Sequence, residues 1–342
     1  MAQARTLLSV QYLRGLAALA VVALHTGWTR TTVGAAGVDL FFVISGFIIV
    51  LVGGQGMAPA AFLRARALRV VPLYWLLTLA LAGAGLAMGK AADPARLLAS
   101  LAFWPRAGFD GRDDPVLIQG WTLNYEAFFY LAFAVVLLLP VRFRLLTLTG
   151  VFAGLSLAGL AVHPAGIAGA AYTSPLLLEF LAGAWLCRAW QRKVVPQGGR
   201  AALLLAAGVL ALAVQAGAEQ VGAGLSDQWQ VVAWGLPALL ILAGALGLEA
   251  SGTLPRVPGL RAVGDASYAL YLTHLMVLWA VLPVLHLWPV AVALPLALLA
   301  CVAAALLVHH GMERPVGRLL VGRRGVASTA QRTGGVTQLQ RG

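Results

Sequence analysis

The sequence predicts an all-α polytopic membrane protein with about ten transmembrane helices and both termini in the cytoplasm. Of its 342 residues, 61% are hydrophobic and 11% are charged, whereas soluble domains carry about a quarter charged residues. Apolar runs of about 20 residues, the length that a membrane-spanning helix requires, recur along the chain between Arg-rich or Gly/Pro-rich breaks.

The apolar runs predict ten spans, with ends defined to within a few residues. They cover residues 8–28, 35–53, 70–89, 120–139, 145–162, 174–189, 200–218, 228–248, 266–286 and 289–312. The first run is interrupted by Arg14 and shows no small-residue cleavage site, so we treat it as a span rather than a signal peptide. Residues 1–315 then form one membrane domain, and we expect the basic residues 316–342 to be a disordered tail.

The distribution of positive charge predicts the orientation. With the N-terminus inside, 18 of the 24 Lys and Arg residues lie on the cytoplasmic side and five on the outer side. Cytoplasmic loops of membrane proteins carry such an excess. The net charge of +12 therefore reflects topology rather than nucleic-acid binding, and we expect a multi-pass protein of the inner (plasma) membrane.

Four ionisable residues are predicted near the outer ends of four different spans: His25, Asp39, Glu126 and Glu179. Ionisable side chains at membrane depth are costly and mark functional sites. Arg14 precedes His25 by eleven residues, which is close to three helical turns, so the two face the same way from opposite halves of the first span. We expect the four outer residues to share one layer.

Five motifs then follow one another in order: YLRGLAALAVVALH, GVDLFFVISGFII, RARALRVVPLYW, WTLNYEAFFYLAF and SYALYLTHL. Together they resemble the membrane-bound acyltransferase-3 family, particularly members that O-acetylate exopolysaccharides, O-antigens and nodulation factors. The resemblance covers roughly residues 8–315. It implies transfer of an acyl group, acetyl by default, from cytosolic acyl-CoA to a hydroxyl of a cell-surface or lipid-linked glycan. Acyl-CoA is then a donor substrate, and we expect no permanently bound cofactor.

The resemblance supports His25 as the general base, because a neutral imidazole can take the proton of an attacking hydroxyl. Asp39 either caps the second span or orients His25. Glu126 is an acceptor-binding group or a second acid/base, or it pairs structurally with an arginine or with Asn124. Glu179 is left open between a functional and a structural role.

The arginines have two interpretations each. Arg66 and Arg69 form an R-x-x-R that either sets topology alone or binds the phosphates of coenzyme A with guanidinium forks, and the resemblance favours donor binding. Arg14 either extends to the cytoplasmic surface or helps to bind the donor.

The remaining candidates for the substrate path or the acceptor site, besides Glu179, are His274, Trp121 and Asn124. His274 is either a structural residue bonded to a neighbouring tyrosine or part of the substrate path. Trp121 belongs to the interfacial aromatic belt or stacks on the acceptor sugar. Ser45 has no G-x-S-x-G frame, so the small residues around it predict close helix packing rather than a nucleophile.

The same residues bear on two further questions, a metal site and a second function class. No metal-ligand motif is present, so we expect no metal. The alternative function is a proton-coupled transporter or flippase for a lipid-linked sugar or small anion, since intramembrane ionisable residues also suit that role. The lack of an evident inverted repeat argues against it.

Overall fold

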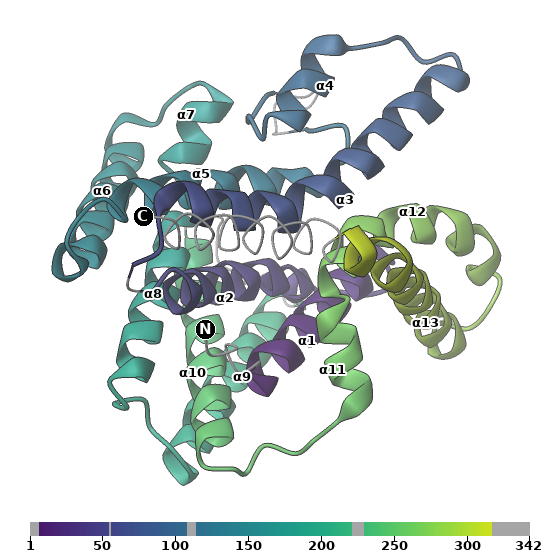
Figure 1. Ribbon diagram of the computed structural model, residues 1–342. Helices are drawn as coiled ribbons and strands as arrows, with labels where there is room; N and C mark the ends of the chain where they lie inside the picture. The colour runs from purple at the N-terminus through teal and green to yellow at the C-terminus, as the bar shows by residue number, and fades with distance from the viewer. Residues whose placement is uncertain (1–6, 55, 108–113, 221–228, 317–342) are drawn as a thin grey trace, which may run out of the picture.

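The computed structural model describes residues 7–54, 56–107, 114–220 and 229–316, which form helices joined by loops (Figure 1). The elements in chain order are α1 (Leu8–His25), η1 (Val33–Ala35), α2 (Ala36–Val52), α3 (Pro59–Ala87), α4 (Pro94–Leu101), α5 (Gly120–Val136), α6 (Val141–Val162), α7 (Ile167–Tyr172), α8 (Leu177–Gln191), α9 (Gly199–Gln220), η3 (Val231–Gly235), α10 (Leu236–Ala250), α11 (Pro258–Asp265), α12 (Ser267–Leu285), α13 (Val290–Val308) and η4 (His309–Glu313).

Every predicted span coincides with a helix, which confirms the all-α polytopic architecture. Within the described residues, nine helical segments are long and apolar enough to cross a membrane. The helix α5 has 17 residues and coincides with the remaining predicted span, 120–139. Residue 228, at the start of the eighth predicted span, and the predicted tail beyond residue 316 lie outside the described residues.

The third span was predicted to start too late. The helix α3 begins at Pro59 rather than at residue 70, because proline is well suited to the first helical position and arginine is a good helix former. Arg64, Arg66 and Arg69 therefore lie on the helix and not in the preceding loop. The predicted start followed the apolar run and so came after these arginines, although a helix can extend beyond the hydrocarbon.

The helices α2 and α8 cross unusually closely. A Cβ atom placed on Gly46 would lie 1.9 Å from the carbonyl oxygen of Phe180, and one on Gly183 would lie 1.8 Å from that of Val43. Only glycine permits such an approach of two backbones. The prediction that the small residues beside Ser45 serve close packing is thus confirmed, and the crossing fixes the relative position of the polar residues on both helices.

The central pair of helices carries the polar residues of interest. In Figure 1, α1 and α2 run through the middle of the molecule, with α12 and α13 to one side and α6 and α7 to the other. The helix α1 packs on α2, α11 and α12, and α2 also packs on α10. Residues of α1 therefore face α12 on one side and α2 on another.

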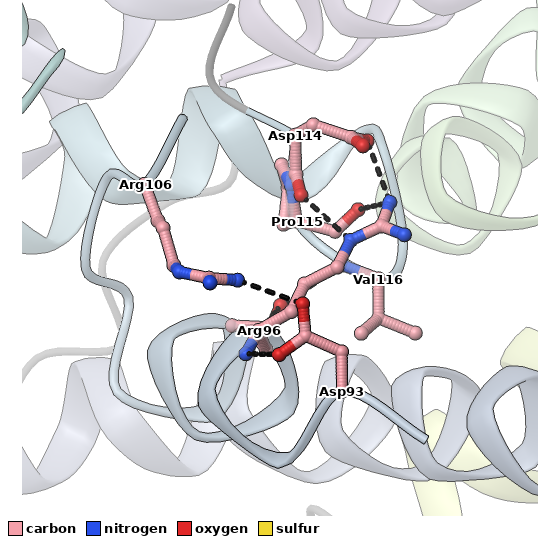
Figure 2. Close-up of polar contacts among 7 residues, drawn as sticks. Asp93, Arg96, Arg106, Asp114, Pro115 and Val116 are labelled. Carbon is pink, nitrogen blue, oxygen red and sulfur yellow. Dashed lines mark hydrogen bonds and ion pairs between the residues drawn. The ribbon is translucent and has the colours of Figure 1, made fainter. Parts of the chain in front are cut away.

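The segment between α3 and α5 contains the short helix α4 and is held by its own polar contacts (Figure 2). Asp93 caps α4 by accepting a hydrogen bond of 2.8 Å from the backbone nitrogen of Arg96. Asp93 also pairs with Arg106 at 2.9 Å, while Arg96 pairs with Asp114 at 2.7 Å. The Arg96 guanidinium further donates to the carbonyl oxygens of Asp114 and Pro115. These contacts hold both described ends of the segment together.

Candidate active site

A small cavity of about 90 Å³ lies between α1, α2, α3, α5 and α12. Arg14 from α1 and the pair Arg66 and Arg69 from α3 line it, together with the carboxylate of Glu126 from α5. The rest of the wall consists mainly of apolar residues of α2 and of tyrosines from α5 and α12. The structure therefore gathers in one cavity residues that are far apart in the sequence.

The three arginines of this cavity have little compensation. Arg66 and Arg69 are three residues apart and so share a face of α3. No ion pair within 4.0 Å among the described residues includes Arg14, Arg66 or Arg69. The Nε of Arg66 is buried without a hydrogen-bond partner. Three guanidinium groups facing one carboxylate leave the cavity positively charged, which suits an anionic ligand.

Glu126 is held by two hydroxyl groups inside this cavity. The Oγ of Ser45 donates a hydrogen bond of 2.9 Å to its Oε1, and the hydroxyl of Tyr130 donates to the same oxygen. Within the described residues, no hydrogen bond or ion pair joins Glu126 to His25 or Asp39. Glu126 therefore belongs with the arginines, and the four ionisable residues do not form one hydrogen-bonded cluster.

The imidazole of His25 packs against that of His274. Their ring centres are 5.0 Å apart, which joins the C-terminal end of α1 to α12. The Nδ1 of His25 is 2.8 Å from the carbonyl oxygen of Val21. A carbonyl oxygen only accepts, so this nitrogen carries the hydrogen, and the Nε2 of neutral His25 is left with its lone pair. His25 has the tautomer that a general base acting through Nε2 requires.

His274 is fully buried, and its Nδ1 is 2.7 Å from the carbonyl oxygen of Tyr271. The sequence left open a bond from His274 to a neighbouring tyrosine, and the structure shows one to the backbone of Tyr271 rather than to a hydroxyl. The Tyr271 ring also lines the arginine cavity and lies 6.0 Å from the His274 ring, centre to centre. Tyr271 thus connects the cavity to the two histidines.

Arg14 and His25 both face α12, as their eleven-residue spacing predicts. Arg14 shares the cavity with Ser267, Tyr268 and Tyr271 of α12, and His25 contacts His274 of the same helix. One stripe of α1 therefore faces α12 from the cavity to the C-terminal end of the helix.

Asp39 is fully buried beside Glu179, away from the contacts made by His25. The Nε2 of Gln230 donates to Asp39 Oδ1 over 3.3 Å, and the Asp39 and Glu179 carboxyl groups lie close enough to influence each other electrostatically. Because the Nδ1 of His25 is bonded to Val21, the structure shows no orienting bond from Asp39 to His25. Asp39 and Glu179 form a separate polar pair between α2 and α8.

Two further candidates stand beside the cavity. Its lining includes Thr122 and Leu123 but neither Trp121 nor Asn124. Trp121 packs edge-on against Tyr125, with ring centres 6.0 Å apart, and Asn124 is buried. The structure thus places neither side chain among the groups that line the cavity.

The sequence did not single out Tyr130 or Gln230, whereas Tyr271 is one of the neighbouring tyrosines that it offered as a partner of His274. Tyr130 follows Glu126 by four residues, a spacing that brings two helical side chains together, and this signal was available in the sequence. Gln230 could not be identified from the sequence because it contacts Asp39 from a helix nearly two hundred residues away. No local sequence pattern predicts such a contact.

A family model described as an acyltransferase domain matches residues 7–310 of the chain. The chain belongs to the acyltransferase-3 family. It is accordingly an O-acyltransferase, and the motifs that carry the resemblance in the sequence also contribute most of the residues around the cavity and the histidine pair.

Two relatives of this acyltransferase were found among characterised proteins. The exopolysaccharide production protein ExoZ of Rhizobium meliloti (strain 1021) is 40% identical over 250 residues, which cover 71% of this chain and 76% of ExoZ. The acyltransferase MdmB of Streptomyces mycarofaciens is 29% identical over 372 aligned positions, which cover 94% of each chain. No solved structure matches the chain.

Proposed function

We propose that this acyltransferase moves an acyl group, acetyl in the first instance, from cytosolic acyl-CoA to a hydroxyl of a cell-surface or lipid-linked glycan, and that it works in the inner membrane. The observation that carries the proposal is the cavity in which Arg14, Arg66 and Arg69 meet with no ion-pair partner within 4.0 Å among the described residues. The similarity to an exopolysaccharide production protein supports a glycan as the acceptor.

The arginines suit the donor. Coenzyme A carries phosphates, which guanidinium groups bind through paired, charge-assisted hydrogen bonds. Arg66 and Arg69 lie on the first three turns of α3, at the end that the positive-charge distribution places in the cytoplasm. A donor bound there can direct its thioester along the wall formed by α12 towards Tyr271.

His25 is suited to the role of the general base. Its Nε2 takes the proton of the acceptor hydroxyl while that oxygen attacks the thioester carbonyl carbon. A carbon–oxygen bond forms and the carbon–sulfur bond breaks. The proton then passes from Nε2 to the departing sulfur, so the products are the acylated glycan and the free thiol of coenzyme A. The hydrogen bond from Nδ1 to Val21 holds the ring in the tautomer that this sequence needs.

The test measures acetyl transfer from labelled acetyl-CoA to glycan in membranes. We expect His25→Ala to lower the rate by about 100-fold or more, the range for removal of a general base. We expect Arg66→Ala to raise the KM for acetyl-CoA by about 10-fold or more, since a hydrogen bond to a charged group contributes about 1.5–3 kcal/mol. Arg142→Ala, which removes an exposed arginine from α6, is the matched control.

Two results would contradict the proposal. One is wild-type transfer by His25→Ala at unchanged protein level. The other is movement of a lipid-linked sugar without acyl-CoA and without an acylated product, which would indicate a transporter. Equal changes in the KM for acetyl-CoA in Arg66→Ala and Arg142→Ala would show that the cavity does not bind the donor.

A further inference from the structure

The second imidazole, that of His274, is the most conspicuous polar group that the proposed reaction leaves unused. It is completely buried, and its Nε2 has no hydrogen-bond partner. A buried nitrogen without a partner costs about 1–3 kcal/mol. Such a group either is a defect or awaits a partner that forms during function.

The state of this nitrogen follows from its other hydrogen bond. The Nδ1 of His274 faces the carbonyl oxygen of Tyr271 at 2.7 Å and so carries the ring hydrogen. The Nε2 of neutral His274 therefore has a free lone pair and can only accept a hydrogen bond. The residue needs a donor, and backbone groups of its own helix are already occupied in the helix.

The neighbouring ring is the group that can become that donor. His25 packs on His274 with ring centres 5.0 Å apart and planes inclined by 57°, so no other group separates the two rings. His25 at rest cannot donate through Nε2, because its own hydrogen sits on Nδ1 and bonds to Val21. Once His25 takes a proton at Nε2, it gains the missing hydrogen. Asp39 makes no such bond to His25.

We propose that His274 is a positioning residue for the base: its Nε2 accepts a hydrogen bond from the Nε2–H of protonated His25. The inference rests on the proposed role of His25 and extends it. His274 forms no bond to substrate and does not change the number of protons transferred. It holds the imidazolium during the reaction, until the proton moves on to the sulfur of coenzyme A. The place that a carboxylate has in a Ser-His-Asp triad is taken by the Val21 carbonyl, which accepts from Nδ1, while His274 shares the Nε2–H with the reacting atoms.

The experiment compares three variants of α12 with wild type in the membrane assay with labelled acetyl-CoA. His274→Leu removes the acceptor, and His274→Gln keeps one because its amide oxygen reaches the position of Nε2. Leu278→Ala removes buried volume one turn further along the same helix and serves as the packing control. Protein level and detergent-solubilised thermal unfolding are recorded for each.

We expect His274→Leu to lower kcat by about 10-fold or more, as loss of a hydrogen bond to a charged group predicts, with the KM for acetyl-CoA within about twofold of wild type. His274→Gln should recover most of the lost kcat. Leu278→Ala should lower thermal stability without lowering kcat to the same extent. A loss of kcat at unchanged KM and unchanged stability would assign His274 to stabilisation of the transition state rather than to donor binding or packing.

The outcomes separate the two hypotheses. If His25→Ala is inactive while His274→Leu keeps the wild-type kcat, the positioning role is overturned and the general base stands. If His274→Leu and His274→Gln lose kcat equally, or if Leu278→Ala loses as much, the residue is structural and the inference fails. If His25→Ala keeps full activity, the proposed function and the inference fail together.

Discussion

Ser45 donates a hydrogen bond of 2.9 Å to Glu126 and so joins α2 to α5 inside a cavity lined by three arginines. Together with Tyr130, it leaves the Glu126 carboxylate in a fixed position. The contact places Glu126 in the same cavity as Arg14, Arg66 and Arg69, close to the alternative that the sequence left open, in which Glu126 pairs with an arginine.

The Ser45 contact predicts the effect of removing one hydroxyl. Ser45→Ala should lower the free energy of unfolding by about 1 kcal/mol, the usual net value of a hydrogen bond, and should change the KM for acetyl-CoA because Glu126 becomes less restrained. Thermal unfolding in detergent and donor kinetics measure the two effects. Ser156→Ala, which loses a 3.2 Å bond to the carbonyl of Ser174 outside the cavity, should leave KM unchanged. An unchanged KM in Ser45→Ala would show that the Ser45–Glu126 hydrogen bond does not influence donor binding.

The crossing of α2 and α8 predicts a steric effect. Gly46→Ala or Gly183→Ala should destabilise the protein by about 1–3 kcal/mol or more, the cost of overpacking a core, because the added methyl meets a backbone carbonyl. Gly150→Ala is the control, since nothing lies within 4 Å of a Cβ there. It should be neutral or stabilising, since alanine favours a helix by about 0.5–1 kcal/mol over glycine. Equal thermal stabilities for Gly46→Ala and Gly150→Ala would contradict the close crossing.

Glu249, near the end of α10, caps the beginning of α1. Its carboxylate accepts hydrogen bonds from the backbone nitrogens of Leu8 and Ser9 and from the hydroxyl of Ser9, over 2.5–2.9 Å. Glu249→Ala should therefore cost about 0.5–2 kcal/mol, the range for loss of a helix cap, in the unfolding of the purified protein. Ser251→Ala, an exposed change just after the same helix, should cost much less. Similar losses from both would show that the cap contributes little.

The Asp93 carboxylate predicts a pH-dependent change in the local stability of the segment between α3 and α5. The backbone nitrogen of Arg96 and the Arg106 guanidinium both donate to it and lower its pKa below the ordinary 3.8. A folded pKa below the unfolded one means that the contribution is present above pH 3.8 and is lost as the pH falls through the lowered value. Hydrogen-exchange protection of the Arg96 amide, corrected for intrinsic rates, should fall over that interval.

Asp93→Asn separates the cap from the charge. Asparagine still caps a helix but does not titrate, so the variant should show lower protection at neutral pH and no step on acidification. A step of wild-type size in the variant would assign the titration to another group.

The proposed orientation predicts which engineered cysteines are labelled from outside. Both natural cysteines, Cys187 and Cys301, are buried and give little background. In intact cells with a permeabilised outer membrane, a membrane-impermeant maleimide should label Lys90→Cys but not Arg142→Cys. The converse pattern would invert the topology and would move the arginine cavity away from the cytosolic donor.

The architecture was readable from the sequence because it depends on local properties. Apolar runs of membrane length give the spans, and the eleven-residue spacing of Arg14 and His25 gives a shared face. The boundary of α3 was misplaced because hydrophobicity, rather than helix propensity, set its start. Arg66 and Arg69 were thereby placed at the cytoplasmic start of the span rather than well inside its helix.

The grouping of the ionisable residues was not readable in the same way. Depth along each span placed His25, Asp39, Glu126 and Glu179 at similar heights, but it says nothing about the direction in which each side chain points. The rotation of each helix and the crossing at Gly46 and Gly183 decide that direction. They divide the four residues among the arginine cavity, the Asp39–Glu179 pair and the histidine pair.

The makeup of the arginine cavity sets a limit on the donor. Its wall combines three guanidinium groups with the apolar side chains of Phe41, Phe42 and Ile48 from α2. A thioester whose leaving group carries phosphates matches both kinds of wall, whereas an uncharged thioester would leave the guanidinium groups without counter-ions. Acyl thioesters that lack a phosphorylated leaving group should therefore be poor donors.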